Sequence, residues 1–180
     1  MIICVTGMPG SGKSEVAEIL RSMGYKTYEL GDIVREEMRK RGMESNPENE
    51  RTFSIYLRRK YGKSITTRRT IAKIRKEKKD KIAIIGFRSK MELNYVKKRF
   101  DAITIAIVAP ERARFERTKK RKRIADPQTM SEFLSIRDKK EERFGIIGAI
   151  KNADYVISNT GTIADLEKSV QMVLKDAGLV

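Results

Sequence analysis

The chain has 180 residues, of which 40 are Lys or Arg and 24 are Asp or Glu, so its formal net charge at pH 7 is +16. This length favours one buried core over two independent domains, and the sequence has no apolar run of about 18 residues, which excludes a predicted membrane-spanning helix. The chain has a single cysteine and no histidine, which excludes an intrachain disulfide and a cysteine–histidine zinc site.

The first predicted element is a strand. Residues 2–6 are mostly apolar and β-branched, a pattern typical of a buried strand. Cys4 lies within this run, where a small core residue is favoured over a reactive thiol. Because the strand begins at Ile2, it leaves no room for a signal peptide, and we expect a soluble, cytoplasmic protein.

A glycine-rich segment follows this strand and fits the spacing G-x-x-x-x-G-K-[ST]. The apolar spacing within residues 15–20 predicts a helix directly after it. A strand, a glycine turn and a helix start surround one anion with main-chain N–H groups and with the positive end of the helix. Lys13 would add charge at the β- and γ-phosphates, and the Ser14 hydroxyl would bind Mg²⁺. A glycine turn that matches by chance is the alternative, and both flanking elements argue against it. The predicted triphosphate loop consists of Gly7, Met8, Pro9, Gly10, Ser11, Gly12, Lys13 and Ser14.

The remaining predicted elements alternate between strands and helices, with one interruption. Short apolar runs indicate the strands, and apolar residues at three- and four-residue spacing after a capping residue indicate the helices. The interruption is a very basic helical hairpin, expected as an insertion at about residues 45–80. In chain order, the predicted elements are strand 26–30, a helix that Gly31-Asp32 opens, hairpin helices at about 49–60 and 64–79, strand 81–85, a helix from Ser89 to Arg99, strand 102–108, a helix from Pro110, a helix at about 128–144, strand 154–158 and a helix capped by Thr162.

This alternation predicts an α/β fold. Strands joined through helices lie parallel with right-handed crossovers, and residues 81–85 are apolar on both faces, as parallel sheets require. We therefore expect a three-layer, doubly wound, five-stranded parallel sheet of the P-loop NTPase type. Residues 1–180 would form one domain.

The basic excess is concentrated in two segments. Residues 58–81 contain 12 basic and 2 acidic residues, and residues 112–123 contain 8 basic and 1 acidic residue. These segments are interpreted either as anion-facing flaps over a polyphosphate, as a nucleic-acid surface, or as a solvated charged face. The nucleic-acid interpretation is not favoured, because Tyr61 and Phe115 are the only aromatic residues available there for stacking.

The topology gathers several polar residues at one edge of the sheet. Ligands of doubly wound sheets bind beyond the carboxyl ends of the strands. This rule places Lys13, Asp32, Arg88 and Asn159 around one crevice. The crevice is the expected site of chemistry.

Three short motifs in the sequence resemble nucleotide kinases. Residues 31–37, G-D-I-V-R-E-E, resemble the G-D-x-x-R-E-E stretch of adenylate kinases, and residues 86–88, G-F-R, resemble their G-F-P-R loop without the proline. Residues 153–161 are similar to the end of dephospho-coenzyme A kinases. The whole chain resembles a group of archaeal P-loop proteins related to adenylate and cytidylate kinases.

This resemblance implies roles for residues around the crevice. Arg35 and Arg88 would hold the phosphate of an acceptor, since a guanidinium binds phosphate in a bidentate manner; the alternatives are an exposed helix charge and an ordinary loop arginine. Asp32 would hold Mg²⁺ through water or orient the acceptor, with a helix N-cap as the alternative. Asn159 and Gly161 would lie beside the nucleotide base, with an ordinary turn as the alternative.

The resemblance also implies a mobile lid at about residues 112–145. Residues 117–123 resemble the start of such a lid. Arg121, Arg123 and Arg137 would neutralise charge on the transferred phosphoryl group, and a solvated face is the alternative for each of them.

The sequence departs from adenylate kinases at the end of the third strand. An aspartate that helps hold Mg²⁺ in those enzymes is replaced here by Ile85, so either Asp32 takes over or the site is weakened. An acidic residue expected in the lid is also missing, because Ala125 precedes Asp126.

The predicted activity is Mg²⁺- and ATP-dependent phosphoryl transfer to a nucleotide or nucleotide-like acceptor. The alternative is a regulatory or RNA-associated nucleoside-triphosphate-binding protein with slow ATPase activity, which Ile85 and the basic segments favour. A kinase acting on the 5′-hydroxyl of a nucleic acid is a third interpretation that no single residue singles out.

Overall fold

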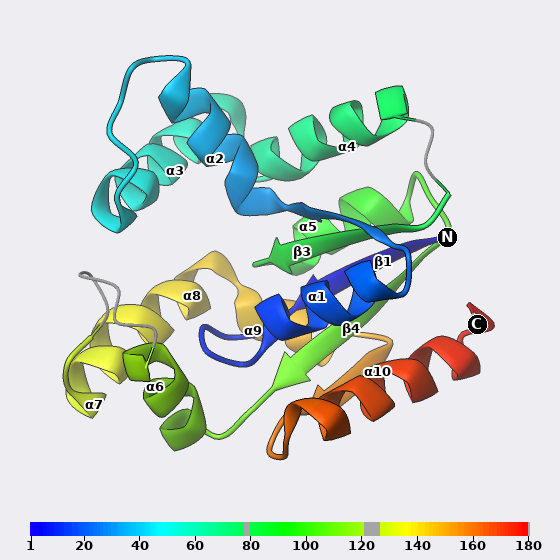
Figure 1. Cartoon of the computed structure of the whole chain (residues 1–180). Helices are drawn as coiled ribbons and strands as arrows, with labels where there is room; N and C mark the ends of the chain where they lie inside the picture. Colours follow the sequence, from blue (N-terminus) through cyan, green and yellow to red (C-terminus); the bar gives the residue numbers. More distant parts are fainter. Residues whose placement is uncertain (78–79, 121–126, 180) are drawn as a thin grey trace.

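A parallel β-sheet forms the centre of the protein (Figure 1). The computed structural model describes residues 1–77, 80–120 and 127–179. Within these residues, five strands lie in the order β2-β3-β1-β4-β5, and every ladder between neighbours is parallel. The predicted five-stranded parallel sheet is therefore confirmed. The strands are β1 (Ile2–Thr6), β2 (Lys26–Glu29), β3 (Ile82–Phe87), β4 (Ala102–Val108) and β5 (Tyr155–Ser158).

Helices cover both faces of the sheet. Alternate side chains of the central strand point to opposite sides, so each face has apolar residues that must be buried by helices. Ile3 and Val5 join a core with α1 (Lys13–Ser22) and α10 (Ile163–Asp176). Ile2 and Cys4 join a second core with α5 (Lys90–Lys97) and α9 (Ile146–Lys151). These two cores make the three layers of the predicted fold. No helix in the described part of the chain is long and apolar enough to cross a membrane.

The inserted hairpin forms a helical unit beside β2 and β3, at the top of Figure 1. The hairpin consists of α3 (Pro47–Tyr61) and α4 (Ile65–Glu77), and α2 (Leu30–Arg39), which precedes it in the chain, packs against both helices to complete the unit. Val34, Met38, Phe53, Leu57 and Ile65 give this unit a small core of its own.

The start of α2 differs from the prediction. The helix begins at Leu30, and Glu29 occupies the N-cap position without a side-chain capping bond. Asp32 therefore lies inside the first turn, and its interpretation as the N-cap is wrong. A carboxylate in the first turn still interacts favourably with the helix dipole.

The third strand is longer than predicted. Gly86 and Phe87 belong to β3 although the sequence predicts a loop there. The pairing shifts between Val5 and Thr6, Gly86 adopts a φ of 97°, and the Thr6 hydroxyl donates to the Phe87 carbonyl at 2.8 Å. The bulge at Gly86, whose backbone is left-handed, thus lets the pairing of β3 with β1 continue to Phe87, although a glycine at this position predicts a turn.

The segment predicted as one helix at 128–144 consists of three pieces. After α6 (Glu111–Lys120), the described chain resumes with α7 (Met130–Glu132), the π-helix η1 (Phe133–Asp138) and α8 (Lys139–Phe144). Thr129 and Glu132 form a capping box at its start. The N-cap predictions for Ser89 and Thr162 are confirmed by their bonds to the main chain.

Glu37 links α2 to α4 and gives the fold a pH-sensitive contact. Its carboxylate lies 2.6 Å from Arg41 and 2.8 Å from Arg69. The hydrogen bond from Arg41, with the contribution of Arg69, holds the pKa of Glu37 below its ordinary value of 4.5. A lowered folded-state pKa means that this stabilisation is present above about pH 4.5 and is lost as the pH falls through the lowered value.

We therefore expect Glu37→Gln to reduce the free energy of unfolding at pH 7. The difference from the wild-type protein should shrink as the pH falls from about 5 to about 3, because the wild-type carboxylate becomes protonated in this range. Denaturant unfolding across this range is the measurement. Glu18→Gln removes an exposed carboxylate paired with Arg21 and serves as the control, because such pairs contribute little. An equal deficit at every pH would contradict the expected linkage.

Candidate functional site

Three glycines shape the loop between β1 and α1. Gly7, Gly10 and Gly12 all have positive φ values, of 149°, 77° and 108°. A Cβ at Gly7 would lie 2.3 Å from the main-chain oxygen of Ile107, and one at Gly10 would lie 2.4 Å from that of Arg114. The loop therefore requires glycine both for its dihedral angles and for its close approach to β4 and α6.

We expect Gly10→Ala to weaken Mg-ATP binding by about tenfold or more, which corresponds to about 1.4 kcal/mol. The added methyl group is opposed by a main-chain atom, so the loop itself has to move. Gly24→Ala is the matched control, because Gly24 also has a positive φ, of 87°, but has nothing within 4 Å of the added Cβ. Titration calorimetry on both variants measures the affinity. Equal affinities for the two variants would show that the loop geometry is not what binds the nucleotide.

Lys13 lies folded over the loop that precedes it. Its ammonium group donates to the carbonyls of Gly7 at 2.7 Å and Met8 at 2.9 Å. Ser14 is exposed in the first turn of α1, where the main-chain N–H groups have no partner within the helix. The loop, Lys13 and Ser14 therefore lie at the start of one helix, a position that favours an anion.

Asn159, directly after β5, holds this loop from the side. Its amide donates to the Ser11 carbonyl at 2.9 Å, and a Cβ on Gly12 would lie 2.1 Å from the same amide nitrogen. Arg117 donates to the Asn159 carbonyl at 2.9 Å and reaches the Ser11 carbonyl at 3.5 Å. Asn159 is buried and bonded to the loop, and its position beside a nucleotide base stays a prediction.

Gly161 is exposed in the turn after β5. A Cβ there would lie 2.6 Å from the carboxylate of Asp165. That carboxylate accepts from the main chain and the hydroxyl of Thr162 at the start of α10. The glycine therefore makes room for the cap of the last helix.

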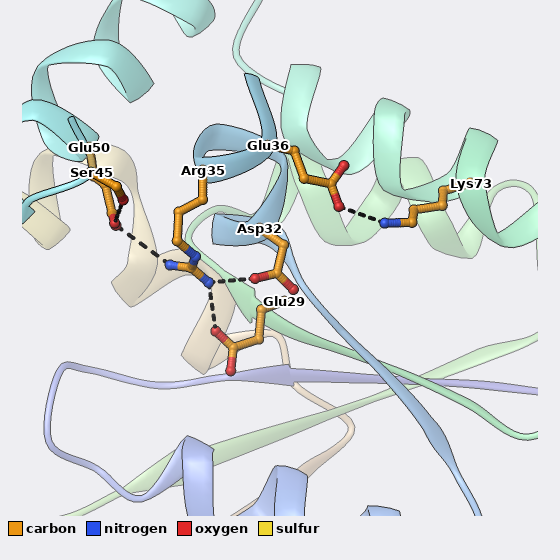
Figure 2. Close-up of polar contacts among 7 residues, drawn as sticks. All are labelled: Glu29, Asp32, Arg35, Glu36, Ser45, Glu50 and Lys73. Carbon is orange, nitrogen blue, oxygen red and sulfur yellow. Dashed lines mark hydrogen bonds and ion pairs between the residues drawn. The ribbon is translucent and has the colours of Figure 1, made fainter. Parts of the chain in front are cut away.

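Arg35 is surrounded by carboxylates (Figure 2). Its guanidinium lies 2.6 Å from Asp32, 3.2 Å from Glu29 and 3.5 Å from Glu50. Partial burial opposes the charge, but these carboxylates, with Asp32 contributing most, raise the pKa of Arg35 above its ordinary value. One cation and three anions leave this cluster with a net negative charge.

A groove of about 550 Å³ opens beside this cluster. It lies on the side of α2 that faces the chain between α2 and α3, and it has charges of both signs. Its lining residues are Asp32, Arg35, Glu36, Arg39, Gly42, Met43 and Ser45.

Arg88 belongs to a different cluster, which also contains Arg58. The two guanidinium groups lie 5.4 and 5.2 Å from the centre of the Phe144 ring. Arg88 pairs with Glu141 at 3.3 Å, and Arg58 pairs with the fully buried Glu92 at 3.2 Å. Burial lowers the pKa of Arg58 below its ordinary value despite this ion pair.

The two arginines that the sequence predicts to act together have different partners, and their joint role stays a prediction. Within the described residues, Arg35 and Arg88 share no ion-pair or hydrogen-bond partner. Arg58 is a residue that the sequence reasoning missed. Its partners come from α5 and α8, far away in the chain, so no local spacing indicates it.

Two of the three predicted lid arginines, Arg121 and Arg123, lie outside the described residues. Arg137 falls within η1, and its side chain is also outside what the structure describes.

The position of the missing carboxylate, at the third strand, lies beside another acidic residue. Ile85 is 4% exposed and pairs with Glu29 in the β2–β3 ladder. Glu29 and Asp32 thus place two carboxylates at this edge, both bonded to Arg35. Within the described residues, no group of three or more acidic, cysteine or histidine side chains forms a metal site by itself.

Comparison with known families gives a consistent result. Residues 3–144 match the family described as "AAA domain". The chain is 43% identical over 180 residues to a UPF0200 protein of Thermococcus gammatolerans, covering 97% of this chain and 94% of that protein. It is 40% identical over 174 residues to a UPF0200 protein of Hyperthermus butylicus, covering 97% and 93%.

Solved structures of similar fold include kinases. The protein TT1252 from Thermus thermophilus has a TM-score of 0.62 at 24% identity, covering 98% of this chain and 97% of that one. Shikimate kinase from Aquifex aeolicus has a TM-score of 0.60 at 21% identity, covering 99% of both chains. A gluconokinase from Sinorhizobium meliloti has a TM-score of 0.55 at 13% identity, covering 97% and 91%. At these identities the likeness establishes the fold.

Proposed function

The chain belongs to the AAA domain family and to the UPF0200 proteins, and from this membership we propose that it is a Mg²⁺- and ATP-dependent phosphotransferase. It would move the γ-phosphoryl group of ATP to a nucleotide or nucleotide-like acceptor. The observation that supports this most directly is the glycine loop with Lys13 held across it at 2.7 and 2.9 Å. Solved kinases of the same fold support phosphoryl transfer as the class of reaction.

The donor end of this site binds and positions the triphosphate. Lys13 would exchange the Gly7 and Met8 carbonyls for phosphate oxygens, and main-chain N–H groups at the start of α1 would donate to the same anion. Phosphoryl transfer depends mainly on such positioning and on charge neutralisation. Arg117, one turn after Arg114 on α6, keeps the loop in place through its carbonyl contacts.

A bound Mg²⁺ suits the oxygen donors at this edge. Ser14 would supply a hydroxyl, and Asp32 would contact the ion's water shell, while the triphosphate supplies the other ligands. When bound, the ion would neutralise charge on the β- and γ-phosphates. Because Asp32 bonds to Arg35 at 2.6 Å, its carboxylate is already fixed in orientation.

At the acceptor end, Arg88 is the better candidate for holding an anionic group. It is 39% exposed and has one carboxylate partner, and Arg58 adds a second positive charge beside it. Arg35 would reach an acceptor phosphate only by releasing at least one of its three carboxylates. Asp32, on the groove, would then orient the acceptor.

The test is a coupled assay of ADP release with a panel of acceptors. Nucleoside monophosphates and dephospho-coenzyme A probe the proposed class, while shikimate and gluconate probe the acceptors named in related structures. We expect one nucleotide-like acceptor to raise ADP release above basal hydrolysis, with one phosphate gained by the acceptor for each ADP formed. No stimulation by any acceptor would overturn the proposal.

The second candidate function is a regulatory or RNA-associated protein with slow ATPase activity. It is favoured by Ile85, which is buried at the position where the resemblance to adenylate kinases implies an aspartate. The ion pairs of the insertion argue against it. Several basic side chains there already have acidic partners, among them Arg69 with Glu37 and Lys73 with Glu36, so less positive charge is available to bind RNA. Steep salt-dependent RNA binding without acceptor turnover would favour this candidate.

A further inference from the structure

A buried ion pair lies directly against the phosphate loop and has no role in the function proposed so far. Arg114 of α6 is 4% exposed, and Asp138 at the end of η1 is 5% exposed. The guanidinium donates to both oxygens of the carboxylate, at 2.9 and 2.6 Å. This bidentate geometry fixes the two groups relative to each other.

The same arginine contacts the phosphate loop and the end of β4. Its guanidinium donates to the Pro9 carbonyl at 3.3 Å and to the Ala109 carbonyl at 3.2 Å. Its own main-chain oxygen is the atom that a Cβ on Gly10 would approach to 2.4 Å. Arg114 therefore contacts the loop through both its side chain and its main chain.

Aromatic side chains exclude water from the pair. The Phe133 ring lies 5.2 Å from the guanidinium carbon of Arg114 and 5.7 Å from the Phe115 ring, in an edge-on arrangement. Phe133 is fully buried. An ion pair in such surroundings is strongly coupled, because moving one partner would leave the other charge buried without compensation.

Asp138 ends a π-helix, and Phe133 begins it. π-Helical turns are uncommon and often mark functional positions. In Figure 1, α6, α7 and α8 form one group beside the sheet edge at which β4 ends. Arg114 is thus a direct link from residues 133–138 to the loop that receives the triphosphate.

We propose that Arg114 and Asp138 are positioning residues that couple the conformation of the phosphate loop to η1 and α8. A nucleotide that fixes Pro9 and Gly10 would also fix Arg114, and through Asp138 it would order the π-helix. By thermodynamic reciprocity, an intact pair would also increase nucleotide affinity. This inference rests on the proposed function only in requiring that Mg-ATP binds the loop.

The test combines hydrogen exchange with calorimetry. In the wild-type protein, saturating Mg-ATP should slow amide exchange in residues 7–14 and also in residues 133–144. Asp138→Asn keeps the side-chain shape but removes the charge, and it should abolish the slowing in 133–144 while residues 7–14 still respond. Its dissociation constant for Mg-ATP should rise by about tenfold, within the usual range of coupling between sites.

Two further variants separate positioning from general stability. Arg114→Lys keeps the charge but lacks the fork that reaches Pro9 and Asp138 together, so it should behave like Asp138→Asn. Asp154→Asn is the control, since Asp154 also pairs with a cation, Lys97 at 2.6 Å, but at the opposite edge of the sheet. It should leave both exchange responses unchanged.

The outcomes distinguish the two proposals. If wild-type protein binds Mg-ATP but shows no exchange response in residues 133–144, the coupling is overturned and the kinase proposal stands, whether or not the variants fold. If Asp138→Asn binds nucleotide with wild-type affinity and responds in both segments, the coupling is likewise overturned. If the wild-type protein does not bind Mg-ATP, both proposals fail.

Discussion

Replacing Lys13 with alanine is expected to lower the rate of ADP release by about 10²- to 10³-fold, the usual effect of removing one group that stabilises developing charge. The ammonium group is held at the centre of the loop by the Gly7 and Met8 carbonyls, so it needs little rearrangement to meet phosphate oxygens. Its removal leaves the main-chain N–H groups in place. We therefore expect turnover to fall more than nucleotide affinity.

The matched control for this variant is Lys97→Ala. Lys97 is also a partly buried lysine, but it pairs with Asp154 at the amino ends of the strands. Steady-state ADP release and calorimetric Mg-ATP affinity are measured for both variants. If Lys13→Ala kept more than about a tenth of the wild-type rate, a factor equivalent to about 1.4 kcal/mol, the lysine would not act on the transferred phosphoryl group.

The second large effect is expected on stability. Glu92→Ala should lower the free energy of unfolding by about 3–5 kcal/mol, the typical cost of removing one partner from a buried ion pair. Glu92 is fully buried, pairs with Arg58 at 3.2 Å, and accepts from the Arg88 main chain at 2.9 Å. The variant leaves a guanidinium that is 11% exposed without its carboxylate.

A double variant tests this explanation. Glu92→Leu with Arg58→Met removes both charges and fills similar volume, and such replacements are often close to neutral. Equilibrium unfolding of the single and double variants forms the measurement. A Glu92→Ala protein within about 1 kcal/mol of wild type, the range of an exposed pair, would mean that Arg58 is solvated after the loss of its partner.

The sheet was predictable because four of its strands are short, mostly apolar runs and β2 alternates between polar and buried residues, patterns that need no long-range information. Residues 102–108 match β4 from end to end. The end of β3 was not predictable, because Gly86 has the local character of a turn residue. Only the bulge opposite Val5 and Thr6, which depends on another strand, keeps Phe87 in the ladder.

The site was predictable where it depends on local sequence. The glycine loop and Lys13 are contiguous, so their spacing alone indicates their geometry. By contrast, the contact of Arg35 with Glu50 of the insertion and that of Arg58 with Glu92 each join two different helices. Such pairs form only in the folded chain, and no spacing within one segment reveals them.

The central position of β1 has a consequence for how the chain is made. β1 is the first strand to leave the ribosome, yet its hydrogen-bonding neighbours, β3 and β4, end at Phe87 and Val108. A nascent chain therefore keeps Ile3 and Val5 without their final partners until residue 108 has been synthesised, and incomplete sheets associate readily in the meantime. Chain closure over such separations is slow compared with local helix pairing. The glycine loop follows the carboxyl end of this strand, so the proposed binding site forms only once the middle of the sheet has formed.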